Sequence, residues 1–583
     1  MSESGLDSLS AQDIAQVWLT GFSRSLSIGD CQAAASAFLE DGWLRDILVF
    51  TWNNRSLFGT SNIVAYLEGT LKKDTLSDFK LNDEPHLAPI YSQSSPKAVS
   101  SGFTFRTPIA LGQGFVNFSQ DETGTWKALT ALMMIKDLIG HEESGPEEGV
   151  YEGHTRSWVD VNEERRKAVE DNPHVLILGG GQTGLNVAAR FHQMKIPSIV
   201  LEREDRIGDN WRNRYPTLSL HTPKNHHSML YEPYPATWPI FTPRDKLANW
   251  LEQYADSQDL VIWTRSTILP TPKYDYASKL WTVTVLRDGK QIHLHPAHIV
   301  IASGTLGHPR IPTLVDMTTF EGDIIHATKY SGGKKFAGNR VVVVGAGNTA
   351  ADICQDLVHC GAAEVTMVQR SSTCVVPRPV STTKLDRMWP LEVPTNISDL
   401  KFASLPLPLI HKLSASRAVQ IAEITKDMQE GLKKAGMQVN LGPNGAGNFI
   451  LVFGRFGGYW LDVGAAELII SGKIKIKQGV EAERLTTSSM IFNDGSSLKA
   501  DAIIFATGYH SIRDTMKETF GEETIELTTP VWGLDDEGEI KGSYRPSGHP
   551  GLWYATGDFF SSRFSSKQLA LEIKAIELGF MNL

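Results

Sequence analysis

Two glycine-rich loops constrain the fold of this chain more than any other part of its sequence. The first loop spans residues 179–184 (GGGQTG) and the second spans residues 345–350 (GAGNTA). Each loop follows a β-branched apolar run and opens an apolar helical pattern, which is typical of a βαβ unit that binds a dinucleotide. Two such loops predict two dinucleotides held face to face, so that a hydride can pass from one to the other.

The segments around the loops predict the fold class. Strands that alternate with helices indicate doubly wound parallel sheets, so we expect an α/β fold with two Rossmann-like dinucleotide-binding domains. The first domain is expected over residues 173–335 and 501–583, and the second domain, residues 336–500, is inserted in it. The apolar strand patterns that alternate with helical patterns lie at 174–178, 198–201, 340–344 and 365–368.

Residues 1–145 contain no dinucleotide loop, and their helical patterns precede alternating strand-like runs. This order predicts a small α+β domain, followed by a linker at 146–172 that begins in an acidic stretch with Gly and Pro. By element order and a loose Trp-Arg-Asp signal, the domain resembles the SnoaL-like, nuclear-transport-factor-like cone fold. Such cones bind a small molecule or serve as dimerisation modules. Both roles remain open, a scaffold is favoured over an active pocket, and the resemblance is compatible with a homodimer through this domain.

The composition excludes several classes of function. The chain has 583 residues, more than one hydrophobic core serves, and its net charge of −10 offers no footprint for nucleic acid. The start lacks a signal peptide and no apolar stretch approaches the roughly 20 residues of a bilayer span, so we expect no membrane anchor and a cytoplasmic location. The 17 histidines and four cysteines show no metal-ligand or CxxC pattern, which predicts reduced thiols and no metal site. The cysteines are Cys31, Cys354, Cys360 and Cys374.

The first loop has the three glycines that a pyrophosphate site requires. Gly179 permits a tight turn, Gly181 lets the backbone approach the pyrophosphate, and Gly184 lets the helix pack closely on the strand. The helix N-terminus supplies free N–H groups for the phosphates. Glu202 ends the next strand, where its carboxylate can accept hydrogen bonds from the ribose hydroxyls.

The second loop ends in alanine, and its next strand ends in Arg370 rather than in a carboxylate. A carboxylate would repel a 2′-phosphate, whereas an arginine with neighbouring hydroxyls would bind it through charge-assisted hydrogen bonds. The sequence therefore predicts NADPH rather than NADH, with a solvated arginine as the alternative interpretation. The residues expected at this nucleotide are Gly345, Gly347, Asn348, Ala350, Arg370, Ser371 and Ser372.

Segments beyond the first loop indicate its nucleotide. Gly208, Trp211 and Arg212 resemble the GGxW segment beside the flavin in class B flavin-dependent monooxygenases, with a surface turn as the alternative interpretation. Gly557-Asp558 looks like the flavoprotein strand that ends in Gly-Asp near the ribityl chain. Residues 565–568 (SSKQ), ending in Gln568, are expected to open a closing helix whose N-terminus points at the flavin pyrimidine. This resemblance implies FAD in the first domain.

A longer string lies between the two loops. Phe320, Gly322, His326 and Tyr330 resemble the FxGxxxHxxx(Y/F) fingerprint of flavin-containing monooxygenases. Baeyer–Villiger enzymes of that superfamily usually carry Trp at the last position, so Tyr330 favours heteroatom oxidation or the plant YUCCA type. His326 has no acid or serine partner visible in the sequence, and its expected role is to fix the hinge between the two domains.

Residues from about 173 to 583 are thus similar to class B flavin-dependent monooxygenases, especially the YUCCA-like branch. Residues 218–224 resemble that branch's LxLHxPK segment, and within them His221 stands near the flavin, where animal members have an asparagine. Ala506, Thr507 and Gly508 match the family's late ATGY segment and are expected beside NADPH.

The resemblance implies an NADPH- and O2-dependent monooxygenase. NADPH would reduce FAD, O2 would add to the reduced flavin as a 4a-hydroperoxide, and one oxygen atom would enter a small organic substrate. N- or S-oxidation and YUCCA-like 2-oxo-acid oxidation remain open, and Baeyer–Villiger ketone oxidation is the alternative. A dithiol reductase would need a CxxC that the chain lacks. A non-catalytic flavoprotein interaction module is the alternative of another class, against which the intact loops argue.

Overall fold

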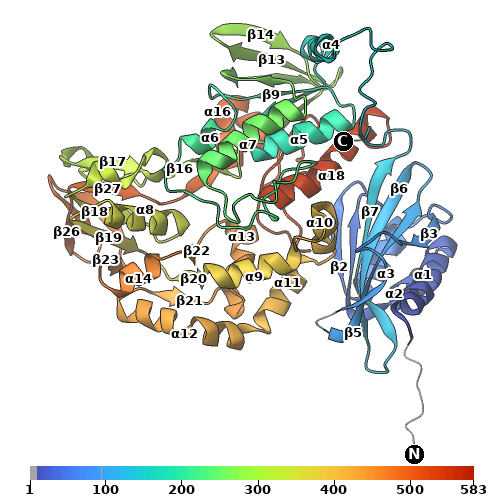
Figure 1. The fold of residues 1–583 in the computed structure, drawn as a ribbon, viewed down its shortest axis with the longest axis horizontal. Helices are drawn as coiled ribbons and strands as arrows, with labels where there is room; N and C mark the ends of the chain where they lie inside the picture. Colours follow the sequence, from blue (N-terminus) through green and yellow to red (C-terminus); the bar gives the residue numbers. More distant parts are fainter. Residues whose placement is uncertain (1–8, 93–94, 583) are drawn as a thin grey trace, which may run out of the picture.

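The computed structural model describes residues 9–92 and 95–582. Figure 1 shows the N-terminal part, in blue, as a long curved sheet with helices on its outer side. A larger body beside it contains the other sheets with their helices. The C-terminal helix α18 (Phe559–Glu577), in red, lies next to the blue sheet (Figure 1).

The N-terminal part has the predicted α+β arrangement. Its seven-stranded sheet has the order β2-β1-β7-β6-β5-β3 with β4 paired to β5, and every pairing is antiparallel except β1 with β7. A capping box starts the first helix, because the Ser10 hydroxyl accepts from the Asp13 N–H at 3.1 Å and the Asp13 carboxylate accepts from the Ser10 N–H at 3.2 Å. The elements are α1 (Ala11–Ile28), α2 (Cys31–Ser36), β1 (Phe38–Ile47), β2 (Asn54–Phe58), α3 (Thr60–Thr70), β3 (Ser77–Leu81), β4 (Ile90–Ser92), β5 (Ser95–Arg106), β6 (Ala110–Gln120) and β7 (Trp126–Leu138).

Aromatic side chains fill the space between these helices and the sheet. Trp18 stacks on Phe22 with ring centroids 4.7 Å apart and meets Phe118 edge-on at 5.3 Å. Strand glycines make room for the rings, since a Cβ on Gly114 would lie 2.2 Å from the ring of Phe103. This packed interior favours a scaffold over an open pocket inside the cone.

The other face of the same sheet packs against the rest of the chain. Ile47 and Leu132 belong to the buried apolar cluster that also holds residues of α18. The Lys567 ammonium of α18 lies 2.5 Å from the Asp137 carboxylate of β7, with both side chains largely buried. This face is therefore covered within one chain and is not available to a second copy.

The first nucleotide-type sheet is parallel throughout and has the order β10-β9-β8-β15-β29. Its strands are β10 (Ile262–Trp263), β9 (Ser198–Leu201), β8 (Val175–Leu178), β15 (His298–Ile301) and β29 (Leu552–Tyr554). Helix α5 (Gln182–Gln193) follows β8 directly after the first glycine loop. Strand β29 comes from the far end of the chain, so the C-terminal segment completes the sheet that β8 begins.

The second nucleotide-type sheet is also parallel, in the order β17-β27-β18-β19-β23, which confirms the α/β class. Strands β17 and β27 lie outside the range 336–500 expected for this domain, and Ile503 of β27 pairs with Ile324 on one side and Val342 on the other. The sequence of an apolar strand does not indicate which sheet the strand joins. Both strands were therefore predicted in the first domain, whose ranges 173–335 and 501–583 contain them. The elements are β17 (Asp323–His326), β27 (Ala502–Phe505), β18 (Arg340–Val344), β19 (Glu364–Gln369), β23 (Ile474–Gln478) and helix α8 (Asn348–His359).

The predicted linker at 146–172 contains a helix, α4 (Trp158–Asp171). Ser157 caps this helix by accepting from the Asp160 N–H at 3.1 Å, and Val161 is its one buried residue among those described. The helix was missed because an almost entirely exposed polar helix lacks the apolar periodicity that marks a helix in a sequence.

A helical region lies between β19 and β23. Three of its strands form a small parallel sheet in the order β21-β20-β22. The elements of the region are β20 (Thr373–Pro377), α9 (Arg378–Met388), α10 (Thr395–Ala403), α11 (Leu407–Ala415), α12 (Ala418–Lys434), β21 (Val439–Asn440), α13 (Phe449–Arg455) and β22 (Tyr459–Asp462).

Within residues 9–92 and 95–582, no helix combines the length and apolar character that a membrane crossing needs.

Candidate active site

The first glycine loop is shaped by close backbone contacts. Gly179 has φ +109°, and a Cβ there would lie 2.8 Å from the Ala302 carbonyl oxygen. A Cβ on Gly184 would lie 1.9 Å from the Gly179 carbonyl oxygen, so only glycine permits helix α5 to approach the loop this closely. Gly181 is the N-cap of α5, and no side chain covers the first N–H groups of the helix. These groups can bind an anion such as a pyrophosphate.

Glu202 lies against this loop. Its Oε2 accepts the Gly180 N–H at 2.7 Å and its Oε1 accepts the Glu204 N–H at 2.9 Å. The residue is 7% exposed. Each carboxylate oxygen keeps a further lone pair, so the carboxylate can accept from the ribose hydroxyls of a nucleotide on the loop.

Asp558 lies in the short turn after β29 and caps helix α18 by accepting from the Ser561 N–H at 2.9 Å. Burial alone would raise the pKa of its carboxyl, yet His226, whose Nε2 is 3.4 Å away, and the Ser561 donors lower that pKa to about 2. Gly557 has φ +111° and donates its N–H to the Thr305 hydroxyl at 2.7 Å. The predicted Gly-Asp turn therefore holds an ionised carboxylate at a helix N-terminus.

Helices α5 and α18 run side by side in the same direction. Asn186 donates to the Ser562 hydroxyl at 2.8 Å, and one turn later Arg190 donates to the Arg563 carbonyl at 3.1 Å. The two helix N-termini therefore point toward the same region. Because both helix ends favour negative charge, this region suits the phosphates and the electron-rich end of a flavin nucleotide.

The predicted start of the closing helix at 565–568 is wrong. Helix α18 begins at Phe559, so Gln568 lies more than two turns inside it. The Gln568 Oε1 accepts from the Asn54 Nδ2 at 2.9 Å, and Asn54 belongs to β2 of the N-terminal part. Gln568 therefore faces the N-terminal sheet and not the helix N-terminus. The sequence error arose because Asp558 was interpreted as a flavin contact and not as the helix cap.

The segment 208–212 forms a short helix, α6 (Asp209–Arg212), beside the first loop. Gly208 has φ +88°, and a Cβ there would lie 2.4 Å from the Ala248 carbonyl oxygen. Arg212 donates to the Ile207 carbonyl at 2.8 Å and to the Glu252 carboxylate at 2.8 Å, so its side chain stabilises the turn. Trp211 packs against the cores of both nucleotide units, and its buried Nε1–H lacks a partner among the described residues. A free buried donor fits a site that a cofactor fills.

The second loop is built similarly but is less crowded at its third position. Gly345 has φ +128°, and a Cβ there would lie 2.3 Å from the Ala506 carbonyl oxygen. Gly347 caps α8 without a side-chain hydrogen bond, whereas Ala350 is fully packed with its methyl group in place. The Asn348 Oδ1 accepts from the Leu461 N–H at 2.9 Å and so joins α8 to the helical region.

Arg370 directly follows β19 and extends into solvent. Its side chain is 75% exposed, and its only charged neighbour among the described residues is Glu481 at 3.5 Å. Ser371 and Ser372 are also exposed, and the Ser372 hydroxyl accepts from Asn440 at 2.9 Å. The exposed guanidinium, whose ion pair with Glu481 is long, can reach a phosphate bound beside the strand end.

The fingerprint histidine joins two strand ends of the second sheet. His326, buried at the end of β17, accepts the Thr328 N–H at Nδ1 (3.2 Å), so its Nε2–H donates to the Gly508 carbonyl at 3.2 Å. Burial lowers the pKa of His326, which favours this neutral form. The Thr507 hydroxyl donates to the Arg310 carbonyl at 2.5 Å. The histidine thus fixes the turn at 506–508 within the second nucleotide unit, whereas its expected role at the hinge between the two domains stays a prediction.

The rest of the fingerprint packs the same unit. The Tyr330 hydroxyl donates to the Asp356 carboxylate of α8 at 2.7 Å, and the pKa of Tyr330 is raised by burial and by this carboxylate. A Cβ on Gly322 would lie 2.1 Å from the Asp501 carbonyl oxygen, and Phe320 is buried in the adjoining apolar cluster. These residues shape the unit and do not line an open surface.

Asp352 of α8 is a site residue that the sequence did not identify. Its Oδ2 accepts from the Tyr215 hydroxyl at 2.5 Å and lies 3.6 Å from the His221 Nε2. Tyr215 and His221 belong to the first nucleotide unit, whereas Asp352 follows the second loop. The contact therefore joins the two units beside the residue expected near the flavin. The sequence signal that could have identified Asp352 is the presence of an aspartate within the apolar pattern of helix α8.

Two groups of known proteins resemble this chain in sequence. Residues 172–430 match the family described as flavin-binding monooxygenase-like. Indole-3-pyruvate monooxygenase YUCCA1 of Oryza sativa subsp. japonica is 32% identical over 340 residues, which cover 58% of this chain and 77% of that protein. Probable indole-3-pyruvate monooxygenase YUCCA9 of Arabidopsis thaliana is 29% identical over 409 residues, covering 70% and 87%.

Solved structures resemble the same part of the fold. Cyclohexanone monooxygenase with bound ε-caprolactone in the Loose conformation has a TM-score of 0.51 at 17% identity, covering 70% of this chain and 88% of that chain. Cyclohexanone monooxygenase from Rhodococcus sp. Phi1 bound to NADP+ has a TM-score of 0.50 at 17% identity, covering 70% and 85%. At this identity the likeness supports the arrangement of the two nucleotide units.

Proposed function

This chain belongs to the flavin-binding monooxygenase-like family, and on that premise we propose that it is an FAD-dependent enzyme that consumes NADPH and O2 and inserts one oxygen atom into a small organic substrate. We assign FAD to the loop at Gly179 and NADPH to the loop at Gly345. The observation that carries this assignment is the residue that ends each second strand. Glu202 is buried against its loop, whereas Arg370 is exposed beside its own.

When bound, FAD supplies the redox chemistry: it accepts a hydride from NADPH and delivers one atom of O2 to the substrate, while the other atom leaves as water. The chain's residues bind and orient the partners. The N-termini of α5 and α18 bind negative charge. The Trp211 Nε1–H can donate to the cofactor, and the Tyr215–Asp352 hydrogen bond keeps the two units in register.

Cofactor discrimination rests on charge. A 2′-phosphate beside Arg370 would gain charge-assisted hydrogen bonds, and exposed hydroxyls follow at Ser371 and Ser372. A 2′-phosphate on the first loop would instead meet the Glu202 carboxylate, which lies against that loop. The two loops therefore select different nucleotides, which gives electron flow a direction.

The substrate class is less closely defined by these observations than the two cofactors are. The relatives compared above are named as indole-3-pyruvate monooxygenases, and the solved structures as cyclohexanone monooxygenases. Tyr330 favours N- or S-oxidation or YUCCA-like 2-oxo-acid oxidation over the Baeyer–Villiger alternative. A non-catalytic interaction module would have no need for an exposed arginine, Arg370, at the end of this strand.

The test of this proposal uses purified full-length protein. We expect a yellow preparation with FAD bound, NADPH oxidation that requires O2, and slower oxidation of NADH. A colourless protein that takes up no FAD, or NADPH oxidation that proceeds equally without O2, would contradict the proposal.

We propose that the N-terminal SnoaL-like part acts as a scaffold for the flavin unit. Its interior is packed with aromatic rings, and its sheet face carries the Lys567–Asp137 ion pair to α18. A homodimer through this part would have to use its helical face, where Val17 and Ile28 of α1 are exposed. Sedimentation of wild type and Val17→Glu protein tests this, because a dimer through α1 would become a monomer in the variant.

A further inference from the structure

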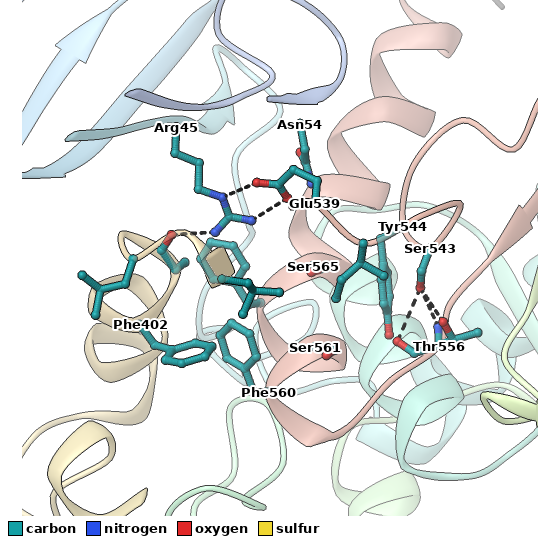
Figure 2. Close-up of a pocket in the computed structure, with 15 residues that line it drawn as sticks. Arg45, Asn54, Phe402, Glu539, Ser543, Tyr544, Thr556, Phe560, Ser561 and Ser565 are labelled. Atoms are coloured by element: carbon teal, nitrogen blue, oxygen red, sulfur yellow. Dashed lines mark hydrogen bonds and ion pairs between the residues drawn. The ribbon is translucent and has the colours of Figure 1, made fainter. Parts of the chain in front are cut away.

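A partly enclosed cavity lies where the N-terminal sheet, helix α10 and helix α18 meet (Figure 2). The rings of Phe402, Tyr544 and Phe560 form much of its wall. Asn54 of β2 and Arg45 of β1 close the side that faces the N-terminal part. The cavity therefore exists only because this part packs on the flavin unit.

Two buried polar atoms at this cavity lack hydrogen-bond partners among the described residues. They are the Asn54 Oδ1 and the Tyr544 hydroxyl, on residues that are 8% and 2% exposed. An orphaned buried acceptor and hydroxyl cost free energy unless a bound molecule satisfies them. Both side chains line the cavity, so they point to an occupant with a polar group.

The cavity offers no free charge to its occupant. The Arg45 guanidinium donates to the Glu539 carboxylate at 2.7 and 2.8 Å and to the Ala403 carbonyl at 2.5 Å. Glu539 also accepts from the Ser56 hydroxyl at 2.6 Å. Because the one cation and the one carboxylate of the lining neutralise each other, the cavity disfavours a substrate carboxylate.

The cavity adjoins the candidate flavin site. Thr556 and Ser561, which flank Gly557 and Asp558, both line it. Ser561 lies in the first turn of α18, whose N-terminus faces the proposed flavin position. A molecule in the cavity would therefore lie within about one helical turn of the cofactor end of the helix.

We propose that this cavity is the substrate site and that it takes a small neutral molecule with one hydrogen-bonding group and an oxidisable atom, rather than a 2-oxo acid. The assignment rests on the proposed function. For a thioether, sulfur gains one oxygen atom of O2, the second atom leaves as water with the hydride of NADPH and a proton, and NADP+ is released. Asn54 and Tyr544 hold the polar group, and the rings hold the rest.

The size of the cavity limits the substrate. About 50 Å³ is open to the centres of water molecules. At about 10–15 Å³ for each water, this is room for roughly four waters, or about 120 Å³ of liquid volume. A substrate of roughly five to seven heavy atoms fits without movement of the walls.

Two matched probes test the assignment on the FAD-loaded protein: 2-(methylthio)ethanol and (methylthio)acetate. They share the thioether and differ in hydroxyl against carboxylate. Binding is followed by the change in the flavin absorbance spectrum. We expect saturable binding of the alcohol and at least tenfold weaker binding of the acid. Equal binding of both probes, tighter binding of the acid, or no binding of the alcohol overturns the proposal.

Tyr544→Phe is the principal variant, because its hydroxyl has no partner among the described residues, so we expect folding to be retained. We expect the alcohol to bind about three- to tenfold more weakly, with FAD content unchanged. Tyr254→Phe is the matched control, since that buried hydroxyl is also unpartnered but lies in α7 (Arg244–Ser257), away from the cavity. A loss in both variants, or in neither, contradicts the assignment.

Ala403→Leu fills the cavity from α10 and gives a second, independent variant. It is expected to abolish binding of the alcohol while NADPH still reduces the flavin. If NADPH still reduces the flavin and O2 is consumed, but both probes bind equally to the wild type and to every variant, the cavity assignment fails and the proposed function stands. If NADPH does not reduce the flavin of wild-type protein, the proposed function itself fails.

Discussion

The two nucleotide units share a loop pattern and differ in how tightly each loop is built. In the first unit, a Cβ at the third loop position would collide with the loop at 1.9 Å, and the carboxylate at the strand end is locked by backbone N–H groups. In the second unit, that position already holds Ala350, and the strand end carries the exposed Arg370. The first site is thus held by close packing and backbone hydrogen bonds, whereas the second has an exposed charge at its edge. This contrast suits a resident FAD and an exchanging NADPH.

The largest expected effect comes from Gly184→Ala. The added methyl group cannot fit beside the Gly179 carbonyl, so α5 must shift, at a cost of about 1–3 kcal/mol, and the loop loses its shape. We expect purified protein with little or no FAD and a lower unfolding temperature. The matched change in the other unit, Ala350→Gly, should cost only about 1 kcal/mol and leave FAD content intact. Equal FAD content in both variants would remove the contrast.

Arg370→Ala tests the exposed side of the comparison. Loss of charge-assisted hydrogen bonds to a 2′-phosphate should raise the KM for NADPH about tenfold to a hundredfold, with the KM for NADH nearly unchanged. Steady-state oxidation of both nucleotides measures this. Glu481→Gln, which removes only the neighbouring carboxylate, should change neither KM by more than a few-fold. An equal rise for NADPH and NADH in Arg370→Ala would refute the phosphate role.

Asp352→Asn tests the contact that couples the two units. Weakening the hydrogen bond from Tyr215 should slow flavin reduction by NADPH several-fold and increase release of hydrogen peroxide, while FAD content stays unchanged. The readouts are anaerobic reduction rate and the ratio of peroxide formed to NADPH consumed. Tyr215→Phe should have the same effect in the same direction. Unchanged rates in both variants would show that the contact is only structural.

The smallest expected effect concerns how the stability of the fold depends on pH in the acidic range. The pKa of Asp558 is about 2 in the folded protein, against a reference value of 3.8, so the group stabilises the fold. A lowered folded pKa gives stability that is fully present above about pH 4 and is lost as pH falls through about 2. Asp558→Asn should lower the unfolding temperature at neutral pH and flatten this pH dependence. Parallel curves for wild type and variant would contradict the assignment.

The sequence predicted what is local and periodic. Strand, glycine loop and helix follow one another within each unit, so the close packing at Gly184 and the place of Glu202 against the loop could be predicted from spacing alone. The place of Arg370 after β19 was predicted in the same way, and its role at a 2′-phosphate stays a prediction. The polar helix α4 was missed because it has no apolar stripe, and the start of α18 was missed because Asp558 was interpreted as a flavin contact and not as the helix cap.

What the sequence did not predict depends on contacts between distant segments. The pairing of β17 and β27 in the second sheet joins residues about 180 positions apart, and nothing local specifies it. Gln568 faces Asn54 across more than 500 residues of sequence. Tyr215 meets Asp352 in the same way, from a different unit. Such contacts follow from packing, which no spacing pattern encodes.

The most direct test of the central claim is anaerobic reduction of the purified, FAD-loaded protein by NADPH and by NADH, followed as loss of the yellow flavin absorbance. The account predicts bleaching by NADPH that is at least tenfold faster than by NADH in wild type. It predicts nearly equal, slow rates in Arg370→Ala, and recovery of the colour only when O2 is admitted. Equal rates for the two nucleotides in wild type, or a flavin that neither nucleotide reduces, would contradict it.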